Sequence, residues 1–240
     1  MKPIAIFRHS PGEGPGYFAT FLDRHSLPWT LFRLDDGVPP PPTPEEYCGL
    51  CFMGGPMSVN DDLPWIPQIL ELIRKADARD IPVIGHCLGG QLMAKAFGAT
   101  VSRNPVKEIG WGRVAASDAA SPGAAPSAAD WLGEVKDFEA FHWHGETFAI
   151  PPGAIRILHS AHCANQAFVR GPHLGLQCHV EMTGTMIRSW CQQWDAEGVP
   201  ASASVQTPEQ MEENMVARIA AMRVVADRLY ARWIEGLRTA

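Results

Sequence analysis

One cysteine lies where the sequence predicts a sharp turn between a buried strand and a helix. A short apolar run ends at Gly85, Cys87 follows two residues later, and Gly89 opens an amphipathic segment. This Gly-x-Cys-x-Gly pattern is the cysteine form of a nucleophile elbow, whose tight turn needs small flanking residues. A helix N-terminus also favours a thiolate. Cys87 is therefore a candidate nucleophile, and an inert thiol in the core is the alternative.

Two backbone N–H groups are candidates to stabilise an oxyanion next to this thiol. The N–H of Leu88 follows the cysteine directly and points at the same place. A second apolar run ends in Gly54 and Gly55, where a backbone N–H can turn outward without a side chain in the way. Gly55 is the second candidate donor, and an ordinary turn between strand and helix is the alternative.

The candidate base is His179. It ends an apolar run, and Glu181 follows two residues later, where the side chains of an extended segment point to the same side. A glutamate in that place can orient an imidazole and stabilise its cation behind a nucleophile. A strand-end histidine with ordinary hydrogen bonds is the competing interpretation, because only geometry distinguishes the two.

Composition limits the classes of protein that this chain can represent. Its 240 residues predict one α/β domain with a small appendage, and a net charge of −6 excludes a broad basic face for nucleic acid. No apolar run approaches the ~20 residues that span a bilayer, and the first apolar run meets Arg8 too early for a signal peptide. Six cysteines fit reduced thiols. We expect a cytoplasmic protein that binds neither nucleic acid nor membrane.

Strands and helices alternate through the first hundred residues. Apolar runs predict strands at 4–7, 29–34, 50–53 and 81–85, and helical periodicity predicts helices between them, one starting at Asp61 to Pro64 with acids in its first turn. This alternation predicts a parallel sheet with helices on both faces. Such sheets bind ligands at the carboxyl ends of their strands, where Gly55 and Cys87 lie.

The second half of the chain has a different pattern. The Ala-, Ser-, Pro- and Gly-rich residues 117–130 predict a surface loop, and later apolar runs predict antiparallel strands that complete the sheet. A helix is expected from about Thr183, followed by a linker at 199–207 and one long amphipathic helix over 208–238.

Three segments together resemble the signatures of class I (triad) glutamine amidotransferase domains. They are Gly-Gly-Pro at 54–56, Gly-His-Cys-Leu-Gly-Gly-Gln at 85–91 and Gly-Leu-Gln-Cys-His-Val-Glu at 175–181. The segments 108–111 and 141–146 resemble free-standing members related to the glutaminase domain of GMP synthetase. The resemblance covers residues 1–195 as one domain, with 196–240 as a linker and C-terminal helix packed on it. It implies a flavodoxin-like, three-layer α/β fold with a mostly parallel central sheet.

The resemblance also implies roles for residues. Cys87 would attack the side-chain amide carbon of glutamine, His179 would pass the thiol proton to the leaving ammonia, and Glu181 would orient His179. A γ-glutamyl thioester would form and then be hydrolysed, with no cofactor or metal. The chain departs from the usual signature at Cys178 and Val180, neither of which carries chemistry. The implied oxyanion donors are Gly55 and Leu88, and the implied glutamine-binding residues are Gln91, Trp143, His144 and Gly145.

Several alternatives remain open at this stage. Cys48 and Cys51 form a C-x-x-C without a second pair, which favours structural cysteines over zinc. His142 and His144 would share one face of a strand and, with Glu146 nearby, could suggest a metal site, but a third ligand is not evident.

The function is either glutamine hydrolysis that supplies ammonia to a separate synthetase chain, or γ-glutamyl peptidase activity on the same triad. A binding or regulatory protein without turnover is the third hypothesis, and the intact triad argues against it.

Overall fold

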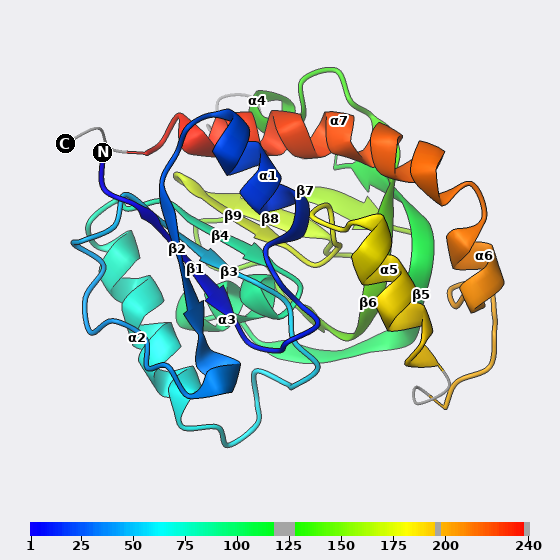
Figure 1. The fold of residues 1–240 in the computed structure, drawn as a ribbon, viewed down its shortest axis with the longest axis horizontal. Helices are drawn as coiled ribbons and strands as arrows, with labels where there is room; N and C mark the ends of the chain where they lie inside the picture. The colour runs from blue at the N-terminus through cyan, green and yellow to red at the C-terminus, as the bar shows by residue number, and fades with distance from the viewer. Residues whose placement is uncertain (118–127, 195–197, 238–240) are drawn as a thin grey trace.

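The computed structural model describes residues 1–117, 128–194 and 198–237. A nine-stranded sheet runs through this described part, in the order β2-β1-β3-β4-β9-β8-β7-β5-β6 (Figure 1). The predicted loop at 117–130 lies largely outside the described residues; its last residues belong to the short helix α4 (Ala128–Leu132).

The first five strands in that order are parallel and form one half of the sheet. Those at its centre are almost wholly buried, because helices cover both of their faces. Their bounds are β1 (Ile4–Arg8), β2 (Trp29–Arg33), β3 (Gly49–Phe52), β4 (Val83–His86) and β9 (His173–Leu176).

The remaining four strands extend the sheet with antiparallel pairs, as the second half of the sequence predicts. The two longest pair over most of their length, with an irregularity between Arg103 and Glu108. The four strands are β5 (Val101–Ala116), β6 (Asp137–Phe148), β7 (Ile155–Ser160) and β8 (Ala167–Arg170).

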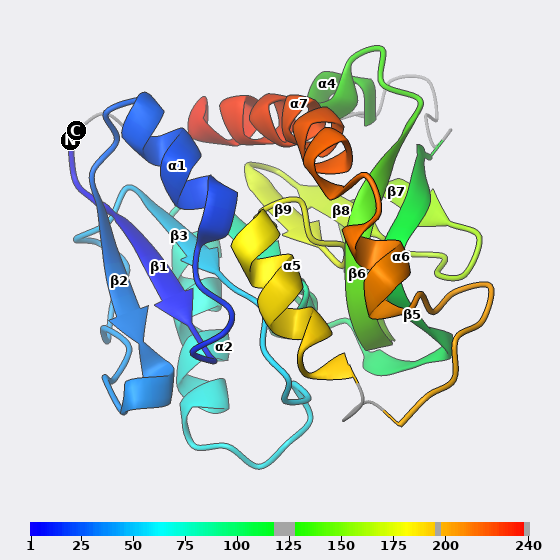
Figure 2. The same cartoon turned by 45° about the vertical axis from the view of Figure 1, so that its right-hand side comes forward.

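Helices cover the two faces of the sheet and bury two apolar cores. The helices α2 (Trp65–Asp77) and α3 (Leu88–Ala96) pack on one face with Phe7, Phe52 and Val83. On the other face, α1 (Gly16–Arg24) and α7 (Met215–Ile234) pack with Ile6 and Ile84 (Figures 1 and 2). The predicted three-layer α/β architecture is confirmed.

Two helix predictions need correction. The helix expected to start at Asp61 begins at Trp65, because Asp61 instead accepts a hydrogen bond from the Ser58 backbone N–H at 2.9 Å in a preceding turn. The single helix expected over 208–238 is two helices, α6 (Pro208–Glu212) and α7. Asn214 between them has a φ of 54°, a left-handed conformation that asparagine tolerates better than most residues and that interrupts a helix.

The helix expected near Thr183 is present as α5 (Gly184–Cys191), with the Thr183 side chain accepting a hydrogen bond from the N–H of Met186. A short 3₁₀-helix, η1 (Leu34–Asp36), follows β2. Within the described residues, no helix is both long and apolar enough to cross a membrane.

Candidate active site

Cys87 occupies the turn between β4 and α3, and its backbone is strained. Its φ is 50° and its ψ is −107°, a combination that residues with a side chain rarely adopt. The N–H of Cys87 donates to the carbonyl of Leu176 at 2.9 Å, which ties the turn to the end of β9. A Cβ on Gly85 would overlap the backbone of Gly89, and a Cβ on Gly89 would overlap the carbonyl of Phe52. The two glycines therefore permit the close packing that holds the turn.

His179 and Glu181 form a buried pair next to this turn. The Nδ1–H of His179 donates to Glu181 Oε1 at 2.6 Å, and each residue is 1% exposed. His179 lies beyond the end of β9, where its backbone pairs with Phe141 of β6 at 2.8 Å (N–H of His179 to the carbonyl of Phe141). The histidine is therefore held between the parallel and antiparallel halves of the sheet.

The charges around His179 favour its imidazolium form. Burial acts to lower the pKa of His179, but the negative charges of Glu181 and the Cys87 thiolate outweigh it, so that the pKa is raised well above its usual value. Burial acts to raise the pKa of Glu181, and the charge and hydrogen bond of His179 act against this effect, so that the pKa is lowered. This electrostatic arrangement suits a thiolate–imidazolium pair backed by a carboxylate.

A cavity of about 360 Å³ opens above Cys87. Leu88 lies at its edge, since a Cβ on Gly55 would lie 2.8 Å from Leu88 Cδ2. His179 and Glu181 are buried behind the lining. The predicted residues that line this cavity are Cys87, Gly55, Gln91, Trp143, His144 and Gly145.

Gln91 joins α3 to the opposite wall of the cavity. Its Nε2 donates to the carbonyl of Glu146 at 3.3 Å and to Gln177 Oε1 at 3.2 Å. Gln177 in turn donates from Nε2 to Cys87 Sγ at 3.6 Å. Gln177 was not predicted as a site residue, although it precedes His179 by two residues and so lies on the same side of an extended segment.

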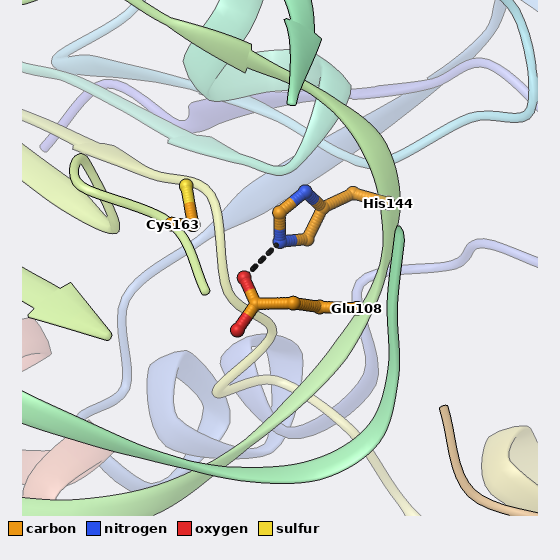
Figure 3. A group of neighbouring side chains, drawn as sticks. All are labelled: Glu108, His144 and Cys163. Carbon is orange, nitrogen blue, oxygen red and sulfur yellow. Dashed lines mark ion pairs between the residues drawn. The ribbon is translucent and has the colours of Figure 1, made fainter. Parts of the chain in front are cut away.

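The wall formed by β6 is fixed by a buried ion pair (Figure 3). His144 Nε2 lies 3.0 Å from Glu108 Oε2, and His144 Nδ1–H donates to the carbonyl of Glu146 at 3.0 Å. Burial acts to raise the pKa of Glu108, but the hydrogen bond and charges from the histidines reverse the effect and lower it to about 2. Glu108 is thus ionised and holds His144 in one orientation.

Cys163 lies beside this ion pair, and the three side chains place possible ligand atoms within 4.8 Å of one another (Figure 3). Each of them already has a hydrogen-bonding partner. Glu108 accepts from Ser160 Oγ at 2.8 Å and from Gln166 Nε2 at 2.7 Å, and Cys163 Sγ lies 3.1 Å from Thr147 Oγ1. We therefore interpret the cluster as a hydrogen-bonded support for His144.

His86, which the sequence left without a role, lies behind the triad. It is completely buried, with Nε2 3.1 Å from the hydroxyl of Tyr230 on α7 and 4.0 Å from Glu181 Oε2. Burial lowers the pKa of His86 despite the opposing charge of Glu181, so the ring is neutral. His86 thereby places a polar group near the second oxygen of Glu181, which has no hydrogen-bond partner of its own among the described residues.

Glu13 and Trp190 are among the cavity residues that were not predicted as site residues. Glu13 comes from the loop between β1 and α1, and Trp190 comes from α5. The signal available for Glu13 was its place beyond the carboxyl end of a parallel strand. Trp190 packs edge-on against His179, with ring centroids 5.0 Å apart.

The cysteine pair at 48 and 51 packs into the structure without bonding to each other. Both thiols are free and buried. Cys48 Sγ donates to the carbonyl of Lys2 at 3.0 Å, and Cys51 Sγ lies 3.6 Å from Met53 Sδ. Burial raises the pKa of both thiols. These surroundings are those of structural cysteines.

Residues 30–190 match the family description "Glutamine amidotransferase class-I". The chain belongs to this family. A crystal structure of a glutamine amidotransferase from Methylobacillus flagellatus is 46% identical, covers 99% of this chain and 96% of its own, and superposes with a TM-score of 0.93.

Curated relatives of this amidotransferase-family chain differ in their named activities. A putative glutamine amidotransferase-like protein of Salmonella typhimurium is 29% identical over 73% of this chain and 74% of its own length. A γ-glutamyl peptidase of Arabidopsis thaliana is 25% identical over 72% of this chain and 73% of its own length. Glutamine-hydrolysing GMP synthases also match. The family is thus established, while the named activities of its members differ.

Proposed function

We propose that this chain hydrolyses a γ-glutamyl amide bond, with Cys87 as the nucleophile. The observation that carries the proposal is the 2.6 Å pair of His179 and Glu181 next to the strained turn that presents Cys87 to the cavity. An amide is a poor electrophile, so its hydrolysis needs a strong nucleophile, oxyanion donors and a protonated leaving group. The arrangement offers a group for each of these needs.

The reaction would proceed in two steps. The Cys87 thiolate attacks the amide carbon, and the oxyanion forms between the backbone N–H groups of Gly55 and Leu88. His179 gives its Nε2 proton to the leaving nitrogen, the C–N bond breaks and a γ-glutamyl thioester remains. His179 then accepts a proton from water as the water attacks the thioester, and the thiolate leaves. Glu181 stabilises the imidazolium in both steps.

The γ-glutamyl part of the substrate would bind in the part of the cavity between α3 and β6. Gln91, Trp143, His144 and Gly145 line this part, and Lys107 and Glu146 line it with opposite charges. An α-amino acid carries one ammonium and one carboxylate, so two opposite charges on the protein match it. Glu146 is itself positioned by Ser58, whose hydroxyl donates to Glu146 Oε2 at 2.8 Å.

A larger γ-glutamyl conjugate is the second candidate substrate, beside glutamine. Trp190 and Gln193 also line the cavity, in addition to the residues assigned to the γ-glutamyl group. The cavity volume of about 360 Å³ falls in the range of sites that bind whole drug-sized ligands. Transfer of ammonia to a separate synthetase chain is the third possibility, supported by the matches to GMP synthases.

The direct test measures glutamate release from L-glutamine and from γ-glutamyl amides by the purified protein. Cys87→Ala should abolish release, whereas Cys191→Ala, a matched loss of a half-buried thiol on α5, should retain it. Release by Cys87→Ala at the wild-type rate, or no release from any γ-glutamyl compound by the wild type, would overturn the proposal.

A further inference from the structure

We propose that Glu13 and Trp190 form a leaving-group subsite that takes a cationic amine. The inference rests on the proposed function, because it names the substrate class of the same site. It predicts that the preferred substrates are γ-glutamyl amides whose leaving amine carries a second, protonated amino group. γ-Glutamyl peptides, whose leaving group carries a carboxylate, would be poorer substrates.

The position of the two residues identifies their side of the cavity. The leaving nitrogen receives its proton from His179, so the leaving group must lie next to that ring. Trp190 packs edge-on against His179 at 5.0 Å between ring centroids. A Cβ on Gly54 would overlap Glu13 Oε2 and would lie 3.2 Å from His179 Cε1, so the Glu13 carboxyl and the imidazole share the space above Gly54.

The loop that carries Glu13 is held in place by the same tryptophan. The Nε1–H of Trp190 donates to the carbonyl of Gly12 at 3.1 Å, directly before Glu13 in the chain. The backbone of this loop continues into α1, whose Tyr17 N–H donates to the carbonyl of Glu181 at 2.7 Å. The loop that carries Glu13 is therefore tied to α5 before Glu13 and to Glu181 after it.

Among the described residues, the Glu13 carboxyl has no Lys or Arg partner and lies beside the triad. In the part of the chain that the structure describes, no group donates a hydrogen bond to its carboxyl, and the charged groups that act on it are His179 and Glu181. Burial raises the pKa of Glu13 to about 7, with His179 opposing and Glu181 adding to the effect. A half-buried carboxyl in such surroundings gains most from a cationic ligand, which restores its ionised form.

The other charged residues of the cavity lie on the γ-glutamyl side. Among the described lining residues, Lys107 is the one Lys or Arg, and it packs over Gly145, where a Cβ would lie 3.3 Å from Lys107 Cγ. A carboxylate on the leaving group would thus meet the Glu13 carboxylate without a nearby Lys or Arg. An ammonium there would meet the Glu13 carboxylate and the ring of Trp190, both of which attract cations.

The test compares three substrates that share the γ-glutamyl group and differ in one small leaving amine. They are the mono-γ-glutamyl amide of ethylenediamine (cationic), γ-glutamylethylamide (neutral) and γ-glutamylglycine (anionic). The kcat/KM of each is measured for the wild type, Glu13→Gln and Glu213→Gln, the last being an exposed carboxylate on the turn between α6 and α7. Thermal unfolding of each variant reports whether the fold is retained.

We expect the wild type to prefer the cationic over the neutral substrate by about tenfold, the effect of one hydrogen bond to a charged group, and to disfavour the anionic one. Glu13→Gln should reduce the cationic-to-neutral ratio to nearly one, while Glu213→Gln keeps it. A wild type without this preference, or a preference that survives Glu13→Gln, would overturn the inference alone. Hydrolysis of L-glutamine by a wild type that hydrolyses none of the three substrates would overturn the inference alone. Failure to hydrolyse L-glutamine as well as all three would overturn the proposed function and the inference together.

Discussion

The parallel and antiparallel halves of the sheet supply opposite walls of the cavity, and they position their residues by different means. In the parallel half, backbone packing positions Cys87, whose φ of 50° is held by the close approach of Gly89 to Phe52. In the antiparallel half, side-chain charge positions His144, whose Nε2 lies 3.0 Å from Oε2 of ionised Glu108. The nucleophile therefore depends on glycines, and the wall that faces it depends on a buried ion pair.

This difference has a consequence for how each wall can be damaged. A backbone-defined turn tolerates changes of charge but not of volume. A charge-defined wall tolerates a small added side chain but not the loss of one ionised partner, because the remaining buried charge is left unpaired. His179 joins the two halves, since its backbone pairs with β6 while its side chain serves the elbow.

The largest effect is expected from Glu181→Gln, at the junction of the two halves. The amide cannot stabilise the imidazolium of His179 and can hold the ring in the wrong tautomer, so kcat should fall by roughly 10²–10⁴. Steady-state kinetics with a γ-glutamyl amide measures this loss. Glu213→Gln serves as the control for loss of a carboxylate, and equal kcat values for the two variants would contradict the role of Glu181.

Gly89→Ala should destabilise the parallel half by ~2–3 kcal/mol, because the new Cβ would overlap the backbone carbonyl of Phe52. The matched change in the antiparallel wall, Gly145→Ala, should cost less than about 1 kcal/mol, since its Cβ would meet only the flexible chain of Lys107 at 3.3 Å. Chemical denaturation gives both free energies of unfolding. Equal losses in the two variants would contradict a backbone-defined elbow.

Glu108→Gln should remove an acid-dependent part of the stability. The folded pKa of Glu108, about 2, lies below its usual value of 4.5, so its ionisation stabilises the fold above pH 4.5, and this contribution is lost as the pH falls toward 2. The contribution is on the order of 3 kcal/mol for a shift of this size. Free energies of unfolding should therefore differ between wild type and variant near pH 6 and converge near pH 2. Parallel pH profiles at a constant separation would refute this account.

The smallest effect is expected from a comparison of Cys87→Gly with Cys87→Ala. Glycine adopts a positive φ without strain, so Cys87→Gly should be more stable than Cys87→Ala by about 1 kcal/mol, although neither hydrolyses substrate. Urea unfolding of the two inactive variants measures the difference directly. An alanine variant that is at least as stable as the glycine variant would show that the turn is not strained.

The parallel half can be predicted well from the sequence because short, local residue patterns specify its strands, helices and turns. Alternating apolar runs and helical stripes indicate the strands, and the glycines around Cys87 indicate the elbow. The two-residue spacing of His179 and Glu181 indicates their pairing, and the resemblance to class I amidotransferases implies its role. The helix break at Asn214 was missed, because a left-handed residue in an otherwise amphipathic segment has no clear sequence signal.

The support of the antiparallel wall could not be predicted in the same way. Glu108 and His144 meet because β5 and β6 pair in a register that contains an irregularity, and no local pattern specifies that register. Glu13 and Trp190 line the same cavity although they lie 177 positions apart in the sequence. Such contacts depend on tertiary packing, which short sequence patterns do not predict.

The central claim is that Cys87 carries the γ-glutamyl group during turnover. Rapid acid quenching during hydrolysis of a γ-glutamyl amide, followed by mass spectrometry of the peptides, tests it most directly. We predict one γ-glutamyl adduct, on the peptide that contains Cys87, in the wild type and none in Cys87→Ala. Turnover accompanied by an adduct on another cysteine, or by the same adduct in Cys87→Ala, would contradict the account.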